Sequence, residues 1–344
     1  LFRLVLRSSL SKKNKLLAGL VLLLVSQAPL LKSLLFGNLS SPELPPTVLL
    51  IQGWSFVCLL IVFVLVIIRD IILLLARIAK AVLGKMAQPQ NNESTGRAFV
   101  MTLGFLPAAY LGLQILLSGL VVVPTAYGVH HSIDIPNINH MDVTLPRLPA
   151  ELDGLVVVQL TDMHISPLIT EEWTAQVIEQ VNALEPDLIL FTGDLFDGKP
   201  EQRAKSIELL KNLKATYGLY GSAGNHEYYN GFAAWMDVIS GIGIEMLLNE
   251  HRVLEINGQE LILAGVNDRV AATFNLPMPD IEAALSGIPE SAVVILMDHR
   301  PDTAPVNAEA GADLQLSGHT HGGQVVGMNQ LVALFNDGFV YGWY

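Results

Sequence analysis

Side chains that can bind metal ions gather in five short segments in the second half of the chain. The segments are Asp162-Met163-His164, Gly193-Asp194, Gly224-Asn225-His226-Glu227, Asp298-His299 and Gly318-His319-Thr320-His321-Gly322. Two side chains at positions i and i+2 of an extended segment point to the same side, so Asp162 can act with His164, and His319 with His321. Imidazole, carboxylate and amide donors without a thiolate favour a borderline to hard transition ion such as Mn, Fe, Co or Zn.

The combination of segments, rather than any single motif, predicts a site. A lone Asp-x-His triplet is frequent by chance, and Gly-Asp before a turn is usually only a turn. The segments at residues 224–227 and 318–322 are rarer, and all five segments follow apolar runs. Binding sites of open α/β sheets assemble where strands end. We therefore expect the five segments to converge on one metal centre.

An alternating α/β pattern would position these segments. Apolar, β-branched runs predict strands at residues 155–160, 188–192, 218–223, 244–248, 253–256, 261–266, 293–297 and 313–316. Helical patterns alternate with them at residues 170–184, 201–214, 232–240, 280–285 and 303–310. Glu171 and Glu172 favour a helix start, because negative charge is stabilised in the first turn.

The five segments together resemble the calcineurin-like metallophosphoesterase family. The resemblance is carried by Asp162-x-His164, Gly193-Asp194-x-x-Asp197, Gly224-Asn225-His226-Glu227, His299 and Gly318-His319-x-His321, and it covers residues 155–326. Residues 145–154, 225–229 and 318–324 are similar to the membrane-anchored branch of that family. The resemblance implies an α/β fold, a four-layer α/β/β/α sandwich of two mixed sheets. Thr161 departs from the commoner Ser of the family and leaves both ligands of its segment intact.

The resemblance also implies a ligand set for two divalent ions. Asp162, His164 and His321 would bind the first ion, Asn225, His299 and His319 the second, and Asp194 would bridge them. Two ions that share Asp194 would lower the pKa of a bridging water and supply hydroxide for in-line attack at phosphorus. His226 would protonate the leaving oxygen or hydrogen-bond the phosphoryl group; alternatively, it only holds Asn225. Asp197 would orient a ligand histidine, or it is a plain turn residue.

The N-terminal part of the chain has a different composition. Residues 1–129 contain eleven Lys or Arg and three acidic residues, whereas residues 130–344 contain nine and twenty-nine. Two uncharged stretches predict membrane spans at about 44–68 and 98–125. An earlier apolar stretch, at about 16–36, is interrupted by Pro29 and Lys32 and predicts a tilted span, a re-entrant segment or an interfacial helix. The alternative is buried core helices, but these are rarely uncharged over such lengths. Basic residues precede the first span and occupy the loop between the second and third, so the positive-inside rule places everything after residue 129 on the non-cytoplasmic side.

These patterns give the expected domain organisation. Residues 1–129 would form a transmembrane helical region, residues 130–147 a linker, and residues 148–344 the metallophosphoesterase domain. The chain starts with Leu1 and ends on the apolar run 339–344. Members of the family usually continue for some tens of residues with further strands, so we expect the domain to be truncated at its C-terminus.

The predicted activity is hydrolysis of a phosphomonoester, phosphodiester or pyrophosphate bond. A domain held at a cell or inner membrane favours a lipid-linked phosphate or an envelope metabolite as substrate, because tethering raises the effective concentration of anything in that surface; alternatively, the spans only localise the enzyme. A net charge of about −20 on residues 130–344 disfavours nucleic acids, which argues against a nuclease. The only cysteine, Cys58, excludes an intrachain disulfide. A non-catalytic membrane sensor or scaffold that retains the metal site is the remaining alternative, and the complete ligand set disfavours it.

Overall fold

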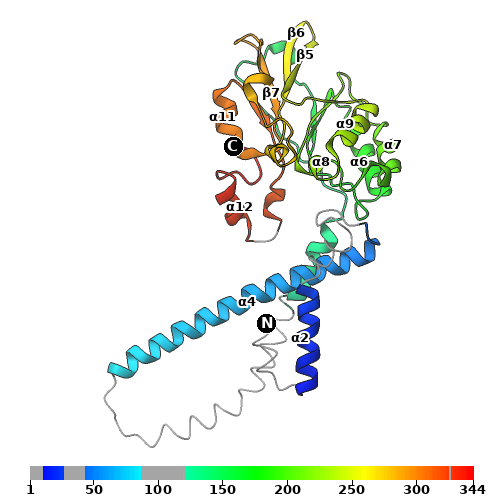
Figure 1. The fold of residues 1–344 in the computed structure, drawn as a ribbon. Helices are drawn as coiled ribbons and strands as arrows, with labels where there is room; N and C mark the ends of the chain where they lie inside the picture. The colour runs from blue at the N-terminus through cyan, green and yellow to red at the C-terminus, as the bar shows by residue number, and fades with distance from the viewer. Residues whose placement is uncertain (1–10, 27–42, 87–118, 120, 325–326) are drawn as a thin grey trace, which may run out of the picture. The chain divides into compact units, whose positions relative to one another are not determined.

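The chain folds into two compact units, residues 1–134 and 135–344. A computed structural model describes residues 11–26, 43–86, 119, 121–324 and 327–344. Figure 1 traces both units, whose positions relative to one another are not determined.

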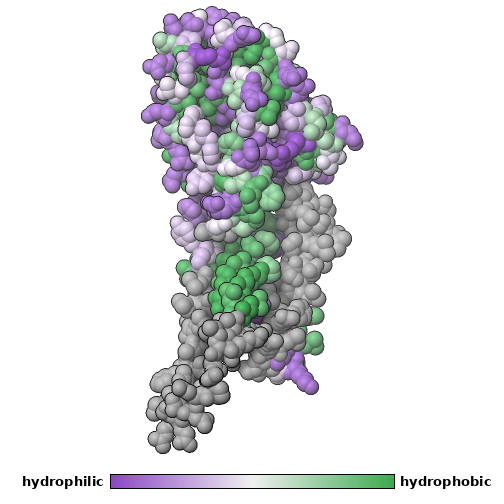
Figure 2. All heavy atoms as spheres, turned by 90° about the vertical axis from the view of Figure 1, so that its left-hand side faces the viewer, coloured by the Kyte–Doolittle hydropathy of each residue, from purple (hydrophilic) through white to green (hydrophobic). Residues whose placement is uncertain are grey.

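The N-terminal unit is helical in its described residues. It contains α2 (Lys12–Ser26) and α4 (Pro46–Met86), and residues 121–131 are also helical. The first 27 residues of α4, Pro46–Ile72, are long and apolar enough to cross a membrane, and none of the most apolar window is buried in the structure. Figure 2 shows this contrast as hydrophobic surface on the helical part and mostly hydrophilic surface on the other unit. The predicted span at about 44–68 falls within this helix.

Helix α4 continues beyond the apolar stretch, where the sequence analysis expects a basic loop. It runs without a break through Arg69 and Asp70 to Met86. No glycine or proline interrupts residues 69–83, and Ala, Leu, Arg and Lys are strong helix formers, which explains the continuation. Of the predicted spans at about 16–36 and 98–125, only residues 16–26, 119 and 121–125 are described; the rest lies outside the described residues. The number of spans stays a prediction.

The C-terminal unit contains two four-stranded sheets. The first has the order β1 (Val157–Leu160), β2 (Leu188–Thr192), β3 (Leu219–Ser222), β4 (Ile244–Met246), with all pairs parallel. The second has the order β5 (Glu250–Ile256), β6 (Gln259–Gly265), β7 (Val293–Met297), β8 (Leu314–Leu316). In this sheet β5 and β6 are antiparallel and the other pairs are parallel. Within the described residues the second sheet is therefore mixed, as expected, and the first is parallel.

Alternating side chains of the strands build three apolar layers. Between the sheets lie Leu188, Leu190, Leu261, Leu263, Val293, Ile295 and Met297, among others. The opposite faces of the same strands carry Ile189 and Phe191, which pack in a cluster with residues of α6 (Glu171–Asn182), α7 (Ala204–Leu210) and α9 (Phe232–Gly241). On the second sheet, Ile262 and Val294 pack against α10 (Ile281–Ala284). This confirms the expected layered α/β arrangement, in which helices cover the outer faces of both sheets (Figure 1).

Shorter elements complete the unit. They are α8 (Asn225–Tyr229), α11 (Ala304–Glu309), α12 (Asn329–Phe335) and the 3-10 helices η1 (Ala150–Leu152), η2 (Pro200–Gln202), η3 (Arg269–Phe274), η4 (Pro301–Thr303) and η5 (His321–Gly323).

Part of the segment interpreted as a linker packs onto the sheets. Ile135 contacts the cluster beneath α6, and Leu145 and Leu148 contact the core between the sheets. Arg147 donates from Nε and Nη2 to the two carboxylate oxygens of Asp313, at 2.8 and 2.7 Å. These contacts tie residues 135–148 to the same compact unit as the strands.

Candidate metal centre

The predicted ligands lie at the ends of strands, on turns with unusual backbone geometry. Each of β1, β2, β3, β7 and β8 runs directly into one of the five segments. Five of the seven predicted ligands have a positive φ angle: Asp162 at 50°, His164 at 43°, Asp194 at 55°, His319 at 70° and His321 at 47°. For residues with a Cβ atom this left-handed conformation costs about 1–2 kcal/mol each. Such strain concentrates at functional sites, where the surrounding structure enforces it.

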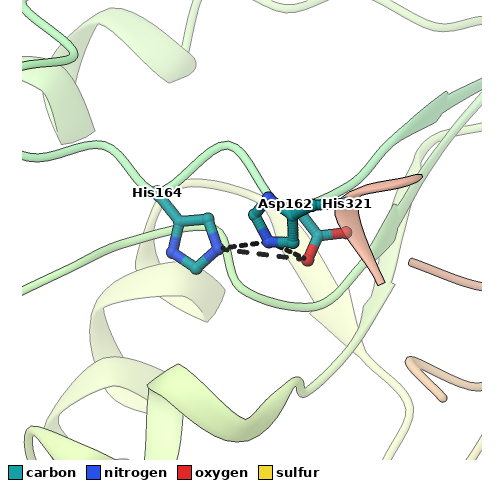
Figure 3. Close-up of side chains that lie close together, drawn as sticks. All are labelled: Asp162, His164 and His321. Atoms are coloured by element: carbon teal, nitrogen blue, oxygen red, sulfur yellow. Dashed lines mark hydrogen bonds and ion pairs between the residues drawn. The ribbon is translucent and has the colours of Figure 1, made fainter. Parts of the chain in front are cut away.

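Asp162, His164 and His321 form a first donor group, drawn in Figure 3. His321 Nε2 lies 3.1 Å from Asp162 Oδ1 and 3.2 Å from His164 Nε2. The remaining separation, between His164 Nε2 and Asp162 Oδ1, is 3.9 Å. An ion with bonds of about 2.1 Å places neighbouring ligand atoms about 3.0–3.4 Å apart. The spacing of this group therefore fits one metal ion.

Asn225, His299 and His319 form a second donor group. His299 Nε2 lies 3.2 Å from Asn225 Oδ1 and 3.3 Å from His319 Nδ1. The other ring nitrogen, His299 Nδ1, is 2.8 Å from the carbonyl oxygen of Thr192 and donates to it. In the neutral ring the lone pair therefore lies on Nε2, which faces the group, as a ligand histidine requires.

One carboxylate oxygen belongs to both groups. Asp194 Oδ2 lies 3.6 Å from His164 Nε2 and 3.3 Å from His299 Nε2. Its partner Oδ1 accepts a hydrogen bond from the backbone N–H of His226 at 2.8 Å, so Oδ2 is the oxygen turned toward the donors. The structure thus brings all seven predicted ligands together around Asp194.

The charges of the carboxyl and imidazole groups in the centre favour binding of a cation. Burial opposes ionisation of Asp194, yet the hydrogen bond and charge of His299 hold the pKa of this carboxyl below its usual range. Burial likewise opposes protonation of His299, but Asp194 raises its pKa to about 9. Burial, the Arg300 charge and His299 lower the pKa of His319 to about 4. In a protein without ions, His299 thus supplies positive charge that divalent ions would supply instead.

Asp197 joins His226 to the first donor group. Asp197 Oδ1 accepts hydrogen bonds from the Nδ1 atoms of both His164, at 3.2 Å, and His226. Burial raises the pKa of Asp197, but these two hydrogen bonds outweigh it and lower the pKa to about 2. A carboxylate in this position fixes the orientation of His164 and directs its Nε2 to the donors. The geometry favours the orienting role predicted for Asp197 over that of a plain turn residue.

Glu227 holds two of the turns together, a role that the sequence analysis did not assign. Its fully buried carboxylate accepts hydrogen bonds from the backbone N–H groups of Asp194 at 3.0 Å, Leu195 at 2.8 Å and Gly224 at 2.8 Å. The turns are also in close contact, because a Cβ atom on Gly193 would lie 2.6 Å from the backbone of Gly224. The signal in the sequence is the Glu of Gly-Asn-His-Glu, but two of its three partners, Asp194 and Leu195, are more than thirty residues away.

Thr161 supports the first donor group. Its hydroxyl donates to Asp162 Oδ2 at 2.6 Å, and the backbone N–H of His319 lies 3.1 Å from Asp162 Oδ1. Serine would offer the same hydroxyl, so the departure at this position preserves the hydrogen bond.

Asp268 and Arg300 form an ion pair beside the second donor group, which the sequence analysis did not predict. Arg300 Nε donates to Asp268 Oδ2 at 2.6 Å, and Arg300 Nη1 lies 2.7 Å from His319 Nε2. No motif marks them, because one follows β6 and the other follows the ligand His299.

Comparisons with known proteins agree with this geometry. Residues 155–323 match the family model of the calcineurin-like phosphoesterase. A "Transmembrane protein with metallophosphoesterase domain" of Danio rerio is 31% identical over 228 residues, which cover 64% of this chain and 52% of that protein. An uncharacterized metallophosphoesterase of Campylobacter jejuni is 32% identical over 217 residues, covering 63% and 56%. A further one, of Helicobacter pylori, is 33% identical over 240 residues, covering 68% and 63%.

The chain spans about half the length of the first two relatives, at 52% and 56%. The matched residues contain every turn of the candidate centre. The chain therefore carries a domain of the calcineurin-like phosphoesterase family.

Proposed function

We propose that this domain uses two divalent ions to hydrolyse a phosphomonoester, phosphodiester or pyrophosphate bond. The observation that carries the proposal is the position of Asp194 Oδ2, 3.6 Å from His164 Nε2 and 3.3 Å from His299 Nε2. One carboxylate oxygen between two sets of donors suits a pair of ions held side by side. The first donor group would hold one ion and the second donor group the other, with Asp194 shared.

The chemistry divides between the ions and the side chains. When bound, Mn, Fe, Zn or Co would supply a nucleophile at neutral pH and polarise the phosphoryl group. His226 would donate a proton to the leaving oxygen, since its Nδ1 is engaged by Asp197. Support for this role is that a ring nitrogen of His226 clusters within 4.8 Å of ligand atoms of His164 and Asp194. Asp197 would keep the His226 ring in place through the contact with its Nδ1.

We further propose that α4 anchors the domain at a membrane, with the domain on the non-cytoplasmic side. The apolar stretch Pro46–Ile72 supports the anchor. The basic residues that follow it would place the end of α4 on the cytoplasmic side, and the further span predicted at about 98–125 would then carry the chain to the non-cytoplasmic side. The relative in Danio rerio is named a transmembrane protein. A domain held at a bilayer would meet lipid-linked phosphates or envelope metabolites at high effective concentration. Equal rates on lipid-linked and water-soluble phosphodiesters would contradict the lipid preference.

Metal depletion tests the activity itself. The full chain, stripped by a chelator and dialysed, should lose turnover of an aryl phosphomonoester and an aryl phosphodiester. Added Mn should restore turnover of at least one of them. Turnover that survives chelation would contradict the proposal. Two bound ions without turnover of any phosphate ester, a pyrophosphate included, would favour the non-catalytic sensor.

A further inference from the structure

Arg300 places a permanent cation beside the second donor group. It follows His299 directly, and its side chain is only 14% exposed. Its Nη1 atom lies 2.7 Å from His319 Nε2. Its other two nitrogens point to Asp268, at 2.6 Å from Nε and 3.3 Å from Nη2. Asp268 thus fixes the Nε and Nη2 side of the guanidinium, while Nη1 points toward the candidate metal centre.

The fixed side of this guanidinium is rigidly held. The side chain of Asp268 is 0% exposed, and its Oδ1 also accepts from the backbone N–H of Val270 at 2.7 Å. The turn that carries Arg300 is held by Asp298, which accepts from the Arg300 backbone N–H at 3.1 Å and from the Thr303 hydroxyl at 2.5 Å. A side chain ordered in this way loses little conformational entropy when it binds a ligand.

The contact between Arg300 and His319 is incompatible with an ion on His319. The nitrogen of His319 that faces the second donor group is Nδ1, 3.3 Å from His299 Nε2. A neutral histidine that gives its Nδ1 lone pair to an ion carries its hydrogen on Nε2 and cannot accept a hydrogen bond there. Arginine can only donate. Occupation of the second donor group therefore frees Arg300 Nη1, while Asp268 still holds the rest of the guanidinium.

We propose that the freed Nη1 of Arg300 donates to a non-bridging phosphoryl oxygen of the substrate. This inference rests on the proposed phosphoesterase function and adds a substrate-positioning residue to it. Arginine suits the role because Asp268 can hold Nε and Nη2 of its planar guanidinium while Nη1 still donates to a phosphate oxygen. Since Asp268 already balances the charge, the gain is a directed hydrogen bond. It applies to every substrate with a non-bridging oxygen and to inorganic phosphate, which is the product of phosphomonoester hydrolysis.

The test uses the full chain loaded with Mn and inorganic phosphate as the probe. Calorimetric titration gives the phosphate affinity, and elemental analysis of the same sample gives the metal content. R300Q should weaken phosphate binding about 10- to 100-fold, the range for losing a hydrogen bond to a charged group, with metal content unchanged. R300K keeps the cation but loses the fork, so its affinity should fall between those of R300Q and the unaltered protein.

A matched control lies on the same two segments of the chain. Arg269 Nη1 pairs with Asp302 at 2.6 Å, next to the pair that Arg300 makes with Asp268. R269Q should leave phosphate affinity and metal content unchanged.

Three results would overturn the inference. The first is equal phosphate affinity in R300Q and the unaltered protein, and the second is an equal loss in R269Q. The third is a loss of metal in R300Q whose phosphate affinity returns with excess Mn, which would assign Arg300 to holding His319. Absence of Mn-dependent turnover would contradict the proposed function instead, and the phosphate titration would still report on Arg300.

Discussion

The two donor groups of the candidate centre have similar chemistry and different access to solvent. In the first donor group the side chains of His164 and His321 are 18% and 30% exposed. In the second, the His299 side chain is 0% exposed. Buried ligands lose hydration that only an ion or a proton can replace. We therefore expect the first ion to exchange readily with solvent, and the ion on His299 to be held more firmly by the folded core.

The difference in exposure follows from how many residues separate each ligand from the end of its strand. His299 is the second residue after β7, which lies between β6 and β8, and all five residues of β7 are buried. His164 and His321 lie further along their turns, three or more residues beyond β1 and β8. Depth in the fold, rather than ligand type, therefore separates His299 from His164 and His321.

Removal of the shared carboxylate should have the largest effect, because it breaks both groups at once. D194N keeps the shape of the side chain but removes the charge between His164 and His299. We expect turnover to fall about 10³-fold or more, since such an electrostatic contribution is worth several kcal/mol. Metal content should fall at both groups. D194N with unaltered turnover would contradict the shared site.

Loss of the proposed proton donor, His226, should leave both donor groups able to bind metal. H226A should lower kcat about 10²- to 10⁴-fold, the usual contribution of general acid catalysis, and leave metal content unchanged. The matched control is H140A, because His140 is an exposed histidine distant in sequence from all five turns. A loss of metal in H226A would instead support the interpretation in which His226 holds Asn225.

A pair of variants compares the two groups directly. H321A should lose one ion and regain it, with part of its turnover, when Mn is raised. H299A should not recover with added Mn, and its melting temperature should fall as well, because it removes a buried ring that packs beside Thr192 and Asp194. Identical metal dependence and stability of the two variants would remove the distinction between exposed and buried groups.

The smallest of the expected effects is the dependence of metal affinity and of stability on pH. The pKa of His299 is raised to about 9 in the protein without ions, and an ion needs the unprotonated ring. Protons therefore compete with metal below about pH 9, and the affinity of the second donor group should fall up to tenfold per pH unit. The sign is opposite for the stability of the metal-free protein. Protonated His299 stabilises it fully below about pH 6.5, and this stability is lost as the pH rises through about 9. Metal titrations and thermal melts between pH 6.5 and 9 measure both slopes.

The local sequence pattern is sufficient to predict the strands that position the centre. The apolar runs at residues 188–192 and 293–297 coincide with β2 and β7, because both strands are fully buried and bounded by turn residues. The five turns could also be predicted, since parallel strands carry their carboxyl ends to one edge of a sheet.

Features that depend on distant contacts could not be predicted. The sequence gives no local sign that Asp268 would meet Arg300, or that Glu227 would bind the backbone of Asp194. Helix α8 is only five residues long, too short for a helical period to appear. The charged residues from Arg69 onward predict a boundary between a span and a loop, whereas helix propensity continues through them to Met86.

Anomalous diffraction from crystals of the Mn-loaded protein would test the central claim most directly. The account predicts two peaks about 3.5–4 Å apart, one beside His164 and His321 and the other beside His299, with Asp194 between them. A single peak, or peaks that do not share Asp194, would contradict it.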